Sequence, residues 1–70
     1  MELHNVNSSN ISSIGYDIPS NVLRVVFSNG GTYDYFDVSE DVYNELDSAD
    51  SKGHYLATQI KNVYSFKKVR

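Results

Sequence analysis

The feature that most constrains this fold is the segment 27–36, FSNGGTYDYF, in which an asparagine and two glycines are followed by alternating tyrosines. The preceding segment 22–27 also alternates, and it places Leu23, Val25 and Phe27 on one face of a strand. Two alternating runs joined by Asn-Gly-Gly are typical of an antiparallel β-hairpin. The centre of the chain therefore predicts a sheet.

The register of this hairpin can be predicted because a one-residue slip moves every side chain to the opposite face. A two-residue loop would pair Val25 with Asp34 and place a carboxylate among core residues. A three-residue Asn-Gly-Gly loop instead pairs Val25 with Tyr35 and Phe27 with Tyr33, and glycine readily supplies the positive φ of such a loop. We therefore expect both tyrosines to face the core.

The segments around the hairpin complete an α+β fold. Strands are expected near 11–17, 22–28 and 32–37, and a turn follows the first of them at 17–21. Ser39 and Ser51 are suitable N-cap residues for helices at 39–49 and 52–63. The tail alternates weakly, as a short C-terminal edge strand would. The prediction is one domain at 1–70, in which a three-stranded antiparallel β-meander precedes two helices packed on one face, with a partly flexible lead-in at 1–9.

The helices are expected to complete a core with the sheet. The second helix places Leu56, Ile60 and Val63 on its inward stripe, and Gly53 lies on the same stripe, where it would allow two backbones to approach closely. The expected core is Leu23, Val25, Phe27, Tyr33, Tyr35, Leu46 and Ile60.

Composition restricts the class of protein. The chain has 70 residues and no cysteine, so neither disulfides nor thiolate-bound zinc can stabilise it, which suits a reducing cytoplasm. The N-terminus shows neither a basic stretch nor an apolar run of the kind found in a signal peptide, and no segment is long and apolar enough to predict a membrane span. We expect a cytoplasmic protein that does not contact a membrane.

The charges are strongly divided along the chain. Residues 1–50 carry all nine acidic residues and a single basic one, whereas residues 51–70 carry five basic residues and no acidic one. One interpretation is that an acidic first helix and a basic C-terminal segment neutralise each other; the other is a basic face presented to an anionic partner. The candidate binding residues are Arg24, Phe36, Lys52, Lys61, Lys67, Lys68 and Arg70.

An ordered set of short motifs resembles the KTSC domain, a module found at the C-terminus of some lysyl-tRNA synthetases and as free-standing small proteins. The set runs through Val6-x-Ser-Ser9, Ile14-Gly-Tyr-Asp17, the central Tyr33-x-Tyr35 and Ser51-x-Gly-x-Tyr55. The resemblance covers nearly the whole chain and implies a free-standing, single-domain member; its synthetase context suggests RNA binding. After Tyr55, Leu-Ala stands where the pattern has an aromatic residue and an amide.

No catalytic, metal or cofactor site is predicted. The sequence lacks nucleophile-elbow, phosphate-loop and His-Glu-x-x-His patterns. Asp47, Asp50 and His54 would share one face only if a single helix ran through Ser51 and Gly53. The leading hypothesis is a noncatalytic binding module that contacts a protein partner or forms a homodimer through the sheet face. The alternative is a module that binds RNA weakly through its basic C-terminal segment.

Overall fold

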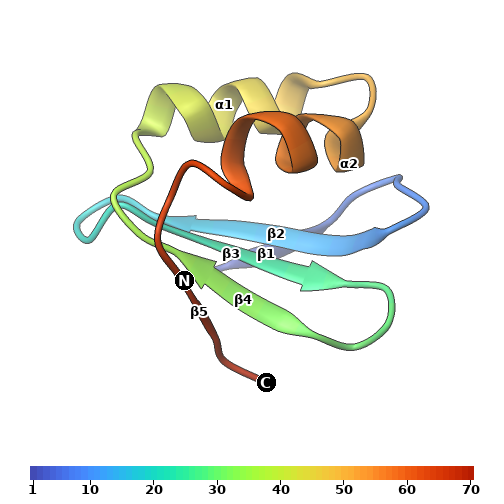
Figure 1. The fold of residues 1–70 in the computed structure, drawn as a ribbon, viewed down its shortest axis with the longest axis horizontal. Coiled ribbons are helices and arrows are strands. Elements are labelled where there is room, and N and C mark those ends of the chain that lie inside the picture. Colours follow the sequence, from blue (N-terminus) through green and yellow to red (C-terminus); the bar gives the residue numbers. More distant parts are fainter.

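A five-stranded antiparallel sheet with helices on one face forms the computed structural model, which describes residues 1–70 (Figure 1). The strands lie in chain order: β1 (Leu3–Asn5), β2 (Ile11–Asp17), β3 (Val22–Phe27), β4 (Thr32–Tyr35) and β5 (Phe66–Lys68). The expected three-stranded meander is the centre of this sheet, and the expected C-terminal edge strand is present as β5. The prediction missed β1, which lies within the segment 1–9.

Strand β1 shows no alternation of buried and exposed residues, because all three of its residues are exposed. The contacts that hold it in place therefore could not be predicted from a local pattern. The chain crosses closely over Gly15 of β2, where a Cβ atom would lie 2.7 Å from the Glu2 carbonyl oxygen. His4 Nε2 also lies 3.0 Å from Asp47 Oδ1. The strand therefore depends on partners far away in the sequence.

The hairpin has a three-residue loop, but its register differs by two residues from the prediction. Val25 pairs with Tyr33 and Leu23 with Tyr35, and the Phe27 N–H donates to the Gly31 carbonyl at 2.8 Å. The loop comprises residues 28–30, because Gly30 adopts the positive φ of 97° that the third loop position requires. A shift of two residues preserves the faces, so both tyrosines still lie on the helix side.

Strand β2 contains an irregularity that the sequence did not indicate. Ile11 pairs with Phe27 and Ser13 with Val26, so Ser12 is an extra residue between them. A bulge of this kind adds one residue to the strand, so that residues on either side of it can face the same way although three positions separate them. As a result Ile11 and Ile14 are both buried in the core.

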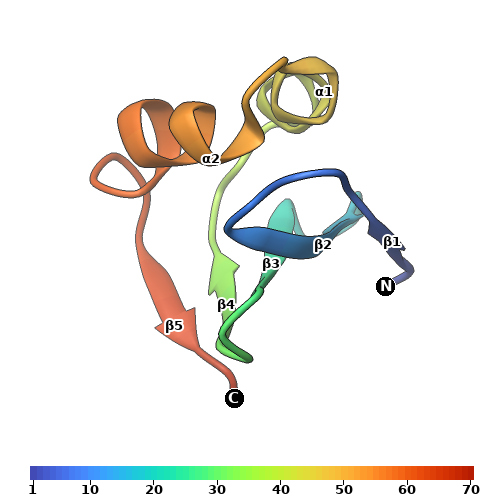
Figure 2. The ribbon, with the colours of Figure 1, turned by 90° about the vertical axis from the view of Figure 1, so that its right-hand side faces the viewer.

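The two helices begin at the predicted caps. Ser39 Oγ accepts from the Val42 N–H at the start of α1 (Glu40–Ser48), and Ser51 Oγ accepts from the His54 N–H at the start of α2 (Lys52–Tyr55). Figure 2 shows α1 above the β1 side of the sheet and α2 above the β5 side. None of the helices is long and apolar enough to cross a bilayer.

The second helix changes geometry after α2 and continues as the π-helical segment η1 (Leu56–Ile60). The Lys61 N–H donates to the Leu56 carbonyl at 2.8 Å, which closes a wide turn. Leu56 and Ile60 are buried as predicted, but beyond this turn Tyr64 packs against the core, while Val63 is 66% exposed. The prediction that Val63 points inward was wrong.

Both layers contribute to a single core of nine residues: Ile11, Ile14, Leu23, Val25, Tyr35, Val38, Leu46, Leu56 and Ile60. Phe27 and Tyr33, which were also expected there, are only half-buried at its edge. Gly53 does not allow two backbones to approach, because a Cβ there would meet only side-chain atoms of Asn10 and Ser8, at 3.7 and 3.8 Å.

Candidate functional site

The principal candidate site is a groove where the end of η1, the β3–β4 hairpin and β5 meet. Its volume is about 390 Å³. The residues that line it are Phe27, Asn29, Tyr33, Tyr35, Lys61, Asn62 and Phe66. We call this region the aromatic groove, because four of the seven side chains are aromatic.

Strand pairing brings the aromatic rings together. Tyr33 and Tyr35 project from the same face of β4, and Phe66 of β5 pairs with Tyr35. The Phe66 ring centroid lies 5.8 Å from each tyrosine ring, and Phe27 meets Tyr33 edge-on at 5.6 Å. Phe66 nevertheless remains 55% exposed. The cluster therefore presents apolar surface that no element of the chain covers.

Two lysines lie at this cluster. Lys61 lines the groove from the end of η1, and Lys68 pairs with Tyr33 across β4 and β5 and thus projects from the same face as that ring. None of the lining residues is acidic, and neither lysine has a carboxylate within ion-pair distance. The groove is consequently apolar and positively charged.

The buried tyrosine of the cluster is neutral at physiological pH. Burial raises the pKa of the Tyr35 phenol, and the neighbouring Tyr33 adds to this effect. The groove therefore offers aromatic surface, amide groups and ammonium groups. These groups can bind a ligand by packing, hydrogen bonding and charge.

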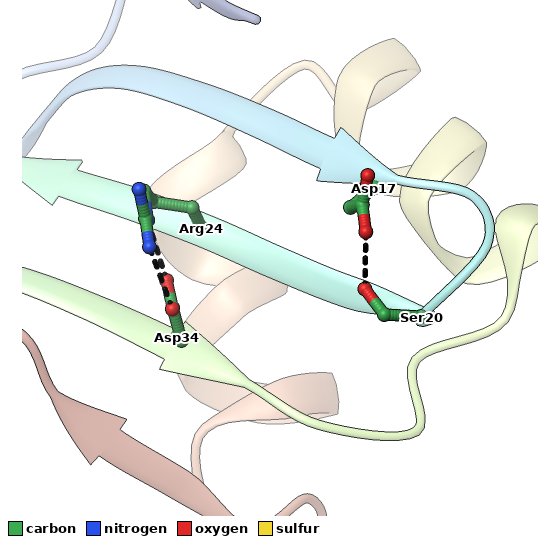
Figure 3. A network of polar contacts seen from close by, with 4 residues as sticks. All are labelled: Asp17, Ser20, Arg24 and Asp34. Atoms are coloured by element: carbon green, nitrogen blue, oxygen red, sulfur yellow. Dashed lines mark hydrogen bonds and ion pairs between the residues drawn. The ribbon is translucent and has the colours of Figure 1, made fainter. Parts of the chain in front are cut away.

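Most of the predicted binding residues lie outside the groove, Arg24 and Phe36 among them. Arg24 lies on the outer face of the sheet, the face away from the helices, where its Nε and Nη2 donate to the Asp34 carboxylate at 2.7 and 2.9 Å (Figure 3). This hydrogen bonding raises the pKa of Arg24 further. Phe36 is half-buried in the bend after β4, and its N–H donates to the Ser65 carbonyl.

The five basic residues of the C-terminal segment do not share one surface. Lys67 pairs with Asp34 and therefore projects from the outer face, opposite to Lys68. Lys52 Nζ donates to the Ala49 carbonyl between α1 and α2, and the backbone of Arg70 pairs with Thr32. Of the predicted residues, only Lys61 lines the aromatic groove, and Lys68 projects beside it from the same face of the sheet.

Comparison with known proteins places the chain in a family. The sequence model of the KTSC domain matches residues 7–64. The chain belongs to the KTSC domain family. A crystal structure of a KTSC domain protein from Yersinia pestis superimposes with a TM-score of 0.95 at 36% identity, covering 99% of this chain and 97% of that one.

Sequence relatives include both free-standing proteins and parts of larger ones. A protein of Tsukamurella paurometabola is 36% identical over 56 residues, which are 80% of this chain and 84% of the relative. A lysine–tRNA ligase of Nostoc punctiforme is 33% identical over 59 residues. That match spans 84% of this KTSC domain but only 10% of the ligase.

A second pocket, of about 230 Å³, unites two segments of the KTSC pattern. It lies between residues 7–10 and 50–54 and is entirely polar. Gly53 approaches Ser8 and Asn10 there, and Ser51 caps α2. Every buried side-chain nitrogen and oxygen in the KTSC domain has a hydrogen-bond partner. The pocket therefore shows no unpaired buried group that would point to a ligand.

The aromatic members of the groove were missed by sequence reasoning. Phe27, Tyr33 and Tyr35 are all expected in the core, where only Tyr35 is buried, and Phe66 is not expected beside them. The weak alternation of the tail was the one usable signal, since pairing of β5 with β4 places Phe66 beside Tyr35. The position of η1 above them, which decides how much of each ring stays open, has no local signature.

Proposed function

We propose that this KTSC domain is a noncatalytic module that binds another protein through the aromatic groove. The observation that carries this proposal is Phe66, which is 55% exposed although it contacts both Tyr33 and Tyr35. Exposed aromatic side chains that are held rigidly by neighbouring rings are common energetic centres of protein interfaces, because they bury much area at little cost in conformational entropy.

The neighbouring chemistry supports binding rather than catalysis. Neither histidine lines the groove, and no carboxylate does. His4 contacts Asp47 on the far side of the molecule, and His54 lies at the polar pocket. An acid–base pair placed within reach of a bound substrate, which most hydrolytic mechanisms require, is absent from the lining of the groove.

Weak RNA binding is the second candidate, because Lys61 and Lys68 lie beside open aromatic rings on which bases could stack. A lysine–tRNA ligase also contains a similar segment. Two ammonium groups neutralise about two phosphates, which gives a salt slope of roughly −1.4 for a single strand and hence low affinity. Protein binding is therefore the function that the geometry favours.

The proposal can be tested by affinity capture from the source lysate with three immobilised proteins: wild type, Phe66→Ala and Ile18→Ala. Ile18 is a matched control, because it is 61% exposed in the turn after β2, outside the groove. We expect a protein partner that wild type and Ile18→Ala retain, that Phe66→Ala loses, and that ribonuclease does not release. Release by ribonuclease would favour RNA, and retention by Phe66→Ala would exclude the groove.

A further inference from the structure

We infer that the occupant of the aromatic groove is an acidic protein segment that carries an aromatic or branched aliphatic anchor. This inference rests on the proposed function and specifies the chemistry of the partner. The anchor would pack on Phe66 and Tyr33, while flanking carboxylates of the partner would approach the ammonium groups of Lys61 and Lys68.

The requirement for an apolar anchor follows from the rings. Phe66, Tyr33 and Tyr35 form a continuous cluster with centroid separations of 5.8 Å between Phe66 and each tyrosine. An apolar side chain placed on this cluster would remove area from water on both partners, at roughly 25 cal/mol for each Å². A purely acidic segment would leave this surface unused.

The requirement for negative charge follows from the lysines. The ion pairs within the chain are His4–Asp47 and Arg24–Asp34, so Lys61 and Lys68 are not neutralised by a carboxylate. The nearest acidic residue on the adjoining strand, Asp34, projects from the outer face and is held by Arg24. The positive charge at the groove is therefore available to a partner.

The same charges disfavour a second copy of this chain as the occupant. Two grooves placed face to face would bring Lys61 and Lys68 of one copy against the same residues of the other. The edge strand β5 also carries Lys67 and Lys68, and lysines at a sheet edge oppose pairing with another edge. An acidic partner relieves the repulsion that a homodimer would create.

RNA would satisfy the requirement for an apolar contact better than the requirement for negative charge at the two lysines. Lys67 projects from the outer face beside Asp34, and Lys52 lies between the two helices, so neither can extend the positive surface of the groove. A single strand would gain stacking but few phosphate contacts, whereas an acidic segment can place two carboxylates and one anchor within a short length.

The test uses the full chain and fluorescence polarisation with a labelled peptide of about twelve residues, in which two phenylalanines alternate with aspartates and glutamates. One control peptide replaces the acids with their amides, a second replaces both phenylalanines with alanine, and an oligouridylate of similar length tests RNA. We expect binding of the acidic aromatic peptide and at least tenfold weaker binding of each control.

Variants of the protein locate the contact. Lys61→Glu and Phe66→Ala should each weaken binding by at least tenfold, while Lys52→Glu and Ile18→Ala should change it less than about twofold. A melting curve first establishes that each variant folds. We expect Phe66→Ala to fold, because Phe66 is an exposed residue. Equal binding of the acidic and amide peptides, or tighter binding of oligouridylate, would overturn the inference.

Failure of this inference can be distinguished from failure of the proposed function. If a captured protein partner is lost with Phe66→Ala but retained with Lys61→Glu, the groove binds protein and the acidic chemistry is wrong. If capture is independent of Phe66 and none of the peptides binds, both proposals fail.

Discussion

Two glycines of this chain occupy very different surroundings. At Gly15, a Cβ atom would lie 2.7 Å from the Glu2 carbonyl oxygen and 2.8 Å from Leu3 Cδ2, closer than real Cβ contacts allow. At Gly53, the nearest atoms would be side-chain atoms at 3.7 and 3.8 Å, an ordinary contact distance. Gly15 therefore permits β1 to pack, whereas Gly53 is a replaceable residue inside α2.

Alanine at the two positions should change stability in opposite directions. Gly15→Ala must displace backbone in β1, so we expect a loss of about 1–3 kcal/mol. Gly53→Ala should increase the free energy of unfolding by about 0.5–1 kcal/mol, because glycine is unfavourable within a helix. Urea titrations of both variants measure these changes. Equal destabilisation by the two substitutions would show that the space around Gly53 is tighter than its contacts indicate.

The phenol of Tyr35 makes stability depend on alkaline pH. Burial raises its pKa above the ordinary value of 10.0, so between the two values the folded state binds more protons than the unfolded state. The stabilisation is therefore fully present below the unfolded pKa of about 10 and is lost as pH rises through the folded pKa.

We expect the free energy of unfolding to be constant up to about pH 9 and to fall above about pH 10. Tyr35→Phe should reduce the steepness of that fall. It should not abolish it, because burial also raises the pKa of Tyr16, Tyr43 and Tyr55. Urea unfolding over this pH range measures the effect, and an identical slope in the variant would mean that Tyr35 ionises as readily in the folded protein as in the unfolded one.

At the scale of elements, the π-helical turn decides which residues of the C-terminal segment reach the core. A regular helix would bring Val63 inward three residues after Ile60, but beyond the wider turn at Leu56–Ile60 Val63 is exposed and Tyr64 alone packs against the core. The following residues Lys61 and Asn62 then lie at the aromatic groove. The same local irregularity thus shapes both the core and the candidate site.

This change of phase predicts the ranking of two neighbouring substitutions. Tyr64→Ala should cost about 1–3 kcal/mol, because it removes a partly buried ring from the edge of the core. Val63→Ala should change stability by less than about 0.5 kcal/mol, because its side chain lies in solvent. Thermal melts of both variants provide the comparison. The opposite ranking would mean that α-helical geometry continues to Val63 in solution.

At the scale of the whole molecule, one small core stabilises the domain, and the charged residues are separated between its two sides. Nine buried residues from the sheet, the bend after it and both helical segments form the core, and no disulfide reinforces it. Helix α1 carries acidic residues on the β1 side of the sheet, whereas Lys61, directly after η1, and the lysines of β5 lie on the β5 side (Figure 2). The groove lies in the basic half.

The small core makes the domain sensitive to single cavities. Ile60→Ala should cost about 2–5 kcal/mol, because Ile60 is completely buried. A domain of this size is stabilised by only about 3–5 kcal/mol, so the variant should be largely unfolded at room temperature. Circular dichroism and a urea titration measure this outcome. A cooperative melt close to that of wild type would show that the contacts of Ile60 are replaceable.

The amino-acid sequence by itself determined the features that depend on neighbours along the chain. The caps Ser39 and Ser51, the strand at 11–17 and the face of Tyr33 and Tyr35 were predicted correctly, and the strand predicted near 22–28 ends one residue earlier, at Phe27. Each follows from a local rule: a side chain that accepts from a backbone N–H two or three residues on, or an alternation with a period of two.

The tertiary structure decided the features that depend on residues far apart. Alternation cannot distinguish registers that differ by two residues, so the choice between pairing Tyr33 with Phe27 or with Val25 was made by the conformation of Gly30 and the packing around it. Strand β1 depends on contacts with Gly15 and Asp47, and the outward position of Val63 accompanies the π turn. The aromatic groove exists for the same reason: β4, β5 and η1 converge there, and no local pattern shows that Phe66 is left uncovered.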